Sequence, residues 1–137
     1  MQFRIGFDEI QRPVSEKTGK NIPMCYGGTH TLRISYEVNM LIKTTSVGLD
    51  INVDRVSGKD VFLSYGGGAG IDFMVRQALN RVKNQPGMDM LELLEGSCMV
   101  LHLGKSPQLS QVFDRVTLRD ISFDEHFVII DFVPNSL

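Results

Sequence analysis

The chain of 137 residues has no tryptophan, only two cysteines, and no apolar run of the roughly 18 residues that a membrane-spanning helix needs. Its first ten residues also lack the apolar stretch of a secretory signal. Cys25 and Cys98 show no spacing typical of a disulfide framework or a metal site. We therefore expect free thiols, a reducing compartment, and a soluble chain that stays in the cytoplasm and has no membrane partner.

Neither sign of charge dominates the composition. Fourteen lysines and arginines stand against 16 aspartates and glutamates, for a formal net charge of −2. Binding to nucleic acid requires a clustered basic surface, so this balance argues against a nucleic-acid partner. The 42% hydrophobic and 22% charged residues are typical of a folded domain, and a chain of this length can bury a core without disulfides or metals. We expect one domain over residues 1–137.

Recognisable catalytic and metal-binding motifs are also missing. The sequence contains no H-E-x-x-H, no C-x-x-C, no G-x-S-x-G and no Walker loop. We expect no metal and no cofactor, and we favour a protein that is not an enzyme. The remaining enzymatic alternative is a small hydrolase or transferase in which Cys25 meets His30 or His102 only in space.

Alternation of apolar and polar residues is the clearest structural signal. Over residues 32–42 every even position is apolar, which predicts a long strand that buries its even-numbered side chains. A second alternation over 49–53 and an apolar run over 61–65 follow, after expected turns at 44–48 and 57–60. Three consecutive strands joined by short turns predict an antiparallel meander with one solvated face.

The rest of the chain mixes helices with strands. Apolar residues at i, i+3, i+4 and i+7 predict a helix over 71–82. A capping pattern ahead of Gly96 predicts a second helix over 88–95, and Ser106 before Pro107 predicts the start of a third, with Leu109, Val112 and Phe113 on its apolar side.

Further strands are expected at both ends of the chain and before the third helix. We predict them at 3–7, at 98–103, at 116–123 with a bulge near 119–120, and at 127–133. Residues 11–28 lack periodicity and contain Pro13, which predicts a long irregular loop. The fold class is α+β: a mostly antiparallel sheet, built on a long meander, with helices packed on one face.

A glycine-rich segment joins the meander to the first of these helices. It departs from G-x-G-x-x-G because Ile71 stands where the third glycine belongs. The free N–H groups at a helix start attract anions, but Asp72 in the first turn repels phosphate, so a tight strand-to-helix turn is favoured. A small-anion or nucleotide site remains the alternative, with Tyr26 of a second Tyr-Gly-Gly sequence as another wall. Its candidate residues are Tyr26, Tyr65, Gly66, Gly67, Gly68 and Gly70.

Polar side chains on the meander form the candidate partner surface. They would line the solvated face. Phe73 lies outside the apolar stripe of its helix, where it can serve as an aromatic anchor or, equally, pack under the expected loop 11–28. The candidates are Arg33, Glu37, Asn39, Asp50, Asn52, Asp54 and Phe73. A merely solvated face is the alternative. The leading hypothesis is therefore a non-enzymatic protein-binding module of the accessory, inhibitor or immunity type, with a basic protein partner and homo-oligomerisation as a further option.

Overall fold

The computed structural model describes residues 1–18, 22–39, 42–67, 70–84 and 87–135. This part of the chain forms nine strands, three α-helices and two short 3-10 helices. In chain order they are β1 (Gln2–Gly6), α1 (Phe7–Thr18), β2 (Met24–Gly28), β3 (Thr31–Asn39), β4 (Thr44–Ser57), β5 (Asp60–Gly67), α2 (Ile71–Val82), η1 (Met88–Met90), β6 (Leu91–Leu94), β7 (Cys98–His102), η2 (Leu103–Lys105), α3 (Pro107–Phe113), β8 (Val116–Phe123) and β9 (Phe127–Pro134).

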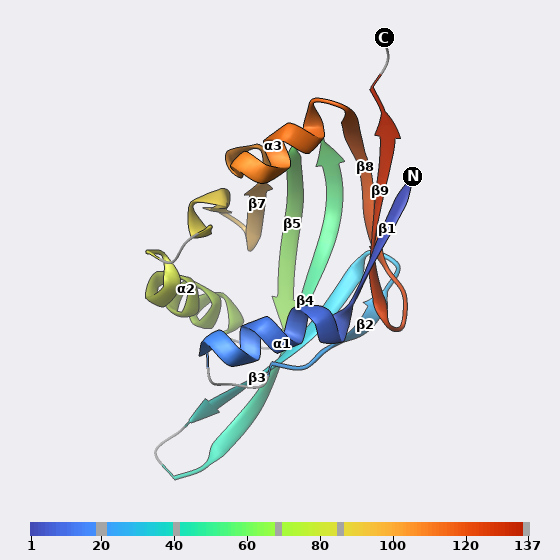
Figure 1. Ribbon diagram of the computed structural model, residues 1–137. Coiled ribbons are helices and arrows are strands. Elements are labelled where there is room, and N and C mark those ends of the chain that lie inside the picture. The colour runs from blue at the N-terminus through green and yellow to red at the C-terminus, as the bar shows by residue number, and fades with distance from the viewer. Residues whose placement is uncertain (19–21, 40–41, 68–69, 85–86, 136–137) are drawn as a thin grey trace.

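The strands form two antiparallel sheets (Figure 1). The larger has the order β2-β3-β4-β5-β7-β6, and the smaller has the order β1-β9-β8. The predicted meander of β3, β4 and β5 is confirmed. The predicted bulge is confirmed as well, since the β8–β9 register shifts between Leu118 and Asp120. The division into two sheets was not predicted.

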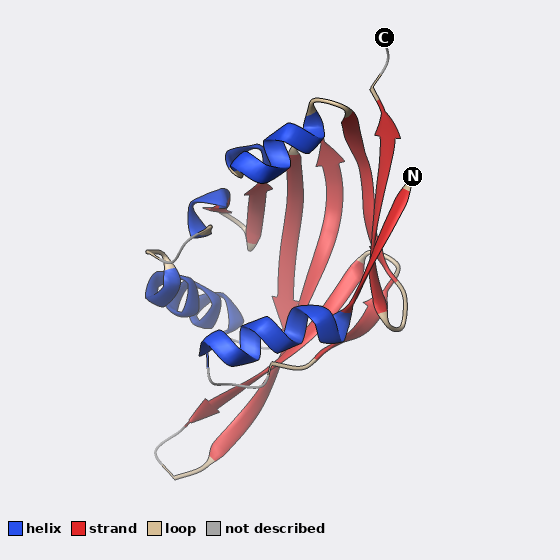
Figure 2. Cartoon of the chain, in the orientation of Figure 1, coloured by secondary structure: helices blue, strands red, loops and turns tan. Residues whose placement is uncertain are grey.

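All three helices lie on one side of the six-stranded sheet, as the fold class predicts (Figures 1 and 2). The three-stranded sheet packs on the same side, so the hydrophobic core lies between the two sheets. Leu32, Val53 and Val61 enter it from the larger sheet. Phe7 closes it from α1 and Phe113 from α3. The opposite side of the larger sheet, which we call the outer face, carries no helix in the described part of the chain.

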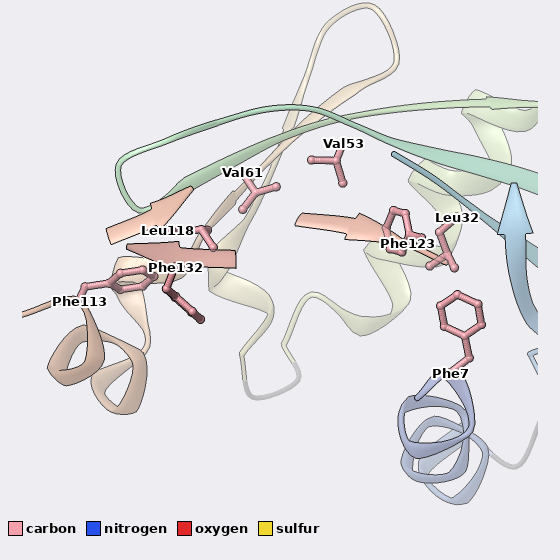
Figure 3. Packing of buried hydrophobic residues seen from close by; sticks show 8 residues of the cluster. All are labelled: Phe7, Leu32, Val53, Val61, Phe113, Leu118, Phe123 and Phe132. Carbon is pink, nitrogen blue, oxygen red and sulfur yellow. The ribbon is translucent and has the colours of Figure 1, made fainter. Parts of the chain in front are cut away.

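The smaller sheet supplies the aromatic part of the core. Figure 3 shows Leu118, Phe123 and Phe132 opposite the side chains of the larger sheet. The centroid of the Phe132 ring lies 5.6 Å from that of the Phe3 ring, in an edge-to-face arrangement, and 6.4 Å from that of the Phe113 ring. Burial of these large apolar groups is the main favourable contribution to folding.

The prediction of an irregular loop over 11–28 is wrong. The structure continues α1 to Thr18 and begins β2 at Met24, and residues 19–21 lie outside the described part. Proline removes one backbone donor and disfavours a helix interior. Here tertiary contacts outweigh that cost, since Phe7 is buried and the side-chain amide of Gln11 donates to the Met24 carbonyl at 3.4 Å. Phe7 accordingly opens the helix instead of ending the first strand.

The predicted helix over 88–95 is also wrong. Its first three residues form the 3-10 helix η1, and β6 follows. Leucine and glutamate are good helix formers, but helix propensity is a small energy that tertiary contacts override. Here β6 gains a complete antiparallel pairing with β7, from Leu91 opposite Leu101 to Leu94 opposite Cys98. The turn between the two strands contains Gly96, whose φ of +73° suits glycine.

Three smaller expectations also fail. The expected turn at 44–48 is part of β4, because threonine and valine at these positions favour an extended chain. The alternation of buried residues does not reach Ile42, which is 96% exposed. On α3, Phe113 is buried but Val112 is 42% exposed. The predicted cap of α3 is confirmed, since Ser106 Oγ accepts a hydrogen bond from the Leu109 N–H at 3.3 Å.

Candidate protein-binding groove

An open groove of about 500 Å³ lies between α2 and the β6 edge of the six-stranded sheet. One wall comes from α2, and η1 and β6 supply the other. We call it the α2–β6 groove. Its lining consists of Phe73, Arg76, Gln77, Leu79, Asn80, Lys83, Met88, Leu91 and Leu93.

Helical and strand periodicity explain which side chains reach the groove. Phe73, Arg76, Gln77 and Asn80 follow the spacing i, i+3, i+4 and i+7, so they share one face of α2. Leu91 and Leu93 are two residues apart on β6 and therefore point to the same side of the sheet. Pairing through β7 places Leu91 in the same row as Val61 of the core, so both leucines lie on the helix-bearing side.

Two polar contacts fix α2 beside this edge. The Tyr65 hydroxyl of β5 donates a hydrogen bond to the Asp72 carboxylate in the first turn of α2. One turn later, Arg76 Nη2 donates to the Leu94 carbonyl at 3.3 Å. Within α2, Arg76 Nε also donates to the Asp72 carboxylate at 3.2 Å, which orients the guanidinium. Helix α2 is thus attached to β5 and β6, and the groove is the space between α2 and β6.

The groove leaves apolar surface uncovered. Phe73 is 66% exposed, and Leu79, Met88, Leu91 and Leu93 are each only partly buried. No side chain of α2 is fully buried within 71–80, where burial is described. The apolar stripe of α2 therefore meets the core only in part. An exposed apolar patch with a polar rim is a common feature of interaction sites.

Basic and amide groups form the polar rim. Arg76 and Lys83 are the charged residues of the lining, Gln77 and Asn80 supply amides, and no carboxylate is among the nine residues. Asp89 is exposed and adjoins Met88 without lining the groove. Since Arg76 pairs with Asp72, the groove combines an apolar floor with a margin whose unpaired charge, within the described residues, is the cation of Lys83.

Sequence reasoning found Phe73 and missed the rest of this site. The signal on α2 was present, since Phe73 shares one helical face with Arg76, Gln77 and Asn80. The second wall has no such signal, because the sequence of 88–95 predicts a helix, whereas Leu91 and Leu93 form a strand edge. The meeting of the two walls depends on contacts that sequence spacing does not encode.

The outer face has the polar character that alternation on β3 predicts. Arg33 and Glu37 are exposed, and Arg33 Nε donates to Asp50 Oδ1 at 2.8 Å. This hydrogen bond raises the pKa of the Arg33 guanidinium. A chain of hydrogen bonds crosses the same face: Thr31 to Asn52 at 2.7 Å, Asn52 to Ser64 at 3.4 Å, and Ser64 to Asp54 at 3.0 Å. The side chain of Asn39, another candidate, lies outside the described residues.

Phe73 does not belong to the outer face. Its neighbour Asp72 bonds Tyr65, which is only 4% exposed and projects to the helix-bearing side of the sheet. Phe73 lines the groove with Leu91 and Leu93 on the helix-bearing side, so it does not form one continuous surface with Arg33 and Asp50. The partner-binding role of these residues stays a prediction. The structure places the exposed ring of Phe73 in the α2–β6 groove.

The glycine-rich segment has the geometry of a close-packed turn. A Cβ atom on Gly67 would lie 2.9 Å from the Gly48 carbonyl oxygen, and Gly70 has a φ of +83°. The carboxylate of Asp72 sits in the first turn of α2, and the Tyr65 hydroxyl, followed by Arg76, holds its pKa below the ordinary value. Burial, followed by the bond to Asp72, raises the pKa of Tyr65. Gly68 lies outside the described residues, and Gly66 has open space around it.

The two tyrosines of the anion alternative are not neighbours. Tyr26, Leu32, Ile51 and Tyr65 form one row across four strands, so about 14 Å of sheet separates the tyrosines. Tyr26 is 42% exposed near the β2 edge, whereas Tyr65 is buried. The anion site stays a prediction that this arrangement does not favour.

The candidate catalytic residues also lie apart. Cys25 lies on β2, where it is exposed and pairs with Arg33 of β3. His102 lies on β7, so four strand spacings, or about 19 Å of sheet, separate it from Cys25. His30 Nε2 contacts Asp120 of β8 at 3.0 Å. Within the described residues, no contact joins Cys25 to either histidine, and no three histidine, cysteine, aspartate or glutamate side chains are placed to hold a metal ion.

His102 connects three strands of the sheet. Its Nδ1 lies 2.8 Å from Asp60 of β5, and its Nε2 lies 3.0 Å from Glu92 of β6. Only the protonated imidazole ring can donate both hydrogen bonds at the same time. The hydrogen bond to Glu92, followed by that to Asp60, raises the pKa of His102 above its ordinary value of 6.5. When it is protonated, His102 thus links edge strand β6 to β5.

This link predicts a pH dependence of stability. Because the folded-state pKa of His102 is raised, its stabilisation is fully present below the unfolded value of 6.5 and is lost as pH rises through the folded value. In urea titrations, the difference in unfolding free energy between the wild type and His102→Gln should be largest near pH ~5.5, where the carboxylates are ionised, and should shrink toward pH ~9. His126→Gln, in an exposed turn, controls for loss of a histidine. A difference that does not change with pH would contradict this role.

Comparison of the chain with known protein families, curated proteins and solved structures gave no match. Among the described residues, no helix has both the length and the apolar content needed to cross a bilayer. The function proposed for the chain therefore rests on its own geometry.

Proposed function

We propose that this chain is a non-enzymatic protein-binding module of the accessory, inhibitor or immunity type, and that the α2–β6 groove is its main contact surface. We place it in the cytoplasm, which fits the free thiols of Cys25 and Cys98. One observation carries the proposal: Phe73 is 66% exposed beside an open groove whose floor is apolar. An exposed aromatic ring of this kind contributes binding energy when a partner covers it, so it can serve as an anchor.

The shape of the site supports a polypeptide partner. The groove is open and its lining extends along α2 from Phe73 to Lys83, as is suitable for an elongated segment. The apolar groups at the centre can be desolvated on binding, while Arg76, Gln77 and Asn80 offer hydrogen bonds at the rim. Partners commonly dock elongated segments into grooves of this type.

The test compares two variants of equal chemistry. Phe73→Asp places a charge in the groove, and Val112→Asp makes a similar change at the 42% exposed Val112 of α3. The immobilised wild-type chain captures candidate partners, which are identified, purified and titrated by calorimetry. We expect Phe73→Asp to weaken binding by about tenfold or more and Val112→Asp to change it by less than about twofold.

Circular dichroism must show that both variants remain folded. A purified partner that binds the wild type and Phe73→Asp equally would refute the groove as the contact surface. Light scattering of the chain alone tests the homo-oligomer alternative, in which the partner is a second copy.

We propose the outer face as a second contact surface, for a basic partner. Glu37 and Asp54 are exposed carboxylates without an ion pair among the described residues. Asp50 contributes less because Arg33 already neutralises it. Charge reversal by Asp54→Lys should slow association with a partner bound there, whereas a partner in the groove should be unaffected.

A further inference from the structure

We propose that the partner segment held in the α2–β6 groove is acidic, with apolar side chains interspersed among its carboxylates. This inference rests on the proposed function and adds the chemistry of the partner. It differs from the expectation of a basic partner, which came from the outer face alone.

The charge of the lining carries the inference. Its charged members, Arg76 and Lys83, are both cationic, and a carboxylate is missing from all nine lining residues. Arg76 is held in place by its bonds to Asp72 and the Leu94 carbonyl, so its guanidinium is oriented before a partner arrives. Lys83 is exposed at the end of α2. Because Asp72 already pairs with Arg76, Lys83 supplies the uncompensated charge, and Arg76 offers an oriented hydrogen-bond donor. A basic segment would meet the Lys83 cation at close range, whereas an acidic one gains a complementary pair.

The floor of the groove sets the second requirement. Phe73, Leu79, Met88, Leu91 and Leu93 offer a mixed aromatic and aliphatic surface. A purely acidic segment would leave this surface in water. Leucine, isoleucine, methionine or phenylalanine side chains would bury it, while their acidic neighbours remain at the basic rim. Methionine in the lining suits such adaptable packing.

The experiment uses a phage-displayed library of random linear peptides, selected on the full wild-type chain. Counter-selection on Phe73→Ala, which removes the ring without adding a charge, keeps the peptides that need the groove. We expect the retained peptides to be enriched in aspartate, glutamate and large apolar residues, and their affinity to fall as salt is raised. Lys83→Glu should weaken them by about tenfold, and the matched Lys43→Glu, at an exposed position near the β3–β4 turn, should leave them unchanged.

The outcomes separate the two proposals. Phe73-dependent peptides that are neutral or basic would overturn the acidic partner and leave the protein-binding groove intact. A selection that yields no Phe73-dependent peptide would overturn both. Titration with dodecanoate tests whether the groove instead binds a small apolar anion. If dodecanoate binds in a way that requires Phe73, and no peptide is selected, the groove is a site for such an anion and a peptide partner is refuted.

Discussion

Replacement of Phe123 by alanine is expected to lower the free energy of unfolding by about 3–5 kcal/mol, which is the usual range for deleting a buried phenylalanine ring. Phe123 is 8% exposed and belongs to the cluster in which both sheets meet. Figure 3 places its ring beside Leu32 of the larger sheet. Its backbone N–H donates to the Thr29 carbonyl at 2.8 Å, so the residue joins the sheets through backbone and side chain.

Phe73→Ala is the matched control for this measurement. It removes the same ring from a site that is 66% exposed, so urea denaturation should give a change within about 0.5 kcal/mol of zero. Equal losses at the two positions would contradict the account, because the core would then include the groove. A small loss at Phe123 would show that the two sheets do not share one core.

Replacement of Gly67 by alanine is expected to destabilise the fold by about 1–3 kcal/mol, as crowding in a packed site does. The added Cβ would lie 2.9 Å from the backbone oxygen of Gly48 and 3.1 Å from a side-chain carbon of Ile71. A backbone oxygen cannot move away as a flexible side chain can. The β4–β5 pair or the start of α2 must therefore shift.

Gly66→Ala provides the comparison for this glycine. A Cβ at Gly66 meets nothing within 4 Å, so its effect on the unfolding free energy should be within about 0.5 kcal/mol of zero. Similar effects at the two glycines would contradict the close-packed turn. Such a result would favour the alternative in which a ligand approaches the glycine-rich backbone.

The parts of the fold that sequence predicted correctly are those in which one face of an element is buried along its length. The meander and α2 follow this rule, because alternation and helical spacing report directly which side meets the core. The bulge in β8 was readable for the same reason, since the apolar phase shifts at Arg119.

The incorrect predictions share a different cause, which is pairing with residues distant in the chain. Helix α1 tolerates Pro13 because Phe7 packs in the core and Gln11 contacts β2. Strand β6 forms because β7 offers a partner, although its leucines and glutamate also suit a helix. The same cause hid the groove, which exists only where Tyr65 and Leu94 hold α2 beside that strand.

Hydrogen exchange of the chain with and without a purified partner tests the main proposal most directly. If the α2–β6 groove is the contact surface, backbone amides within 71–83 and 88–94 should exchange more slowly in the complex, and those of β3 should be unchanged. Protection confined to residues 31–39 and 44–57 would instead assign binding to the outer face and would contradict the groove.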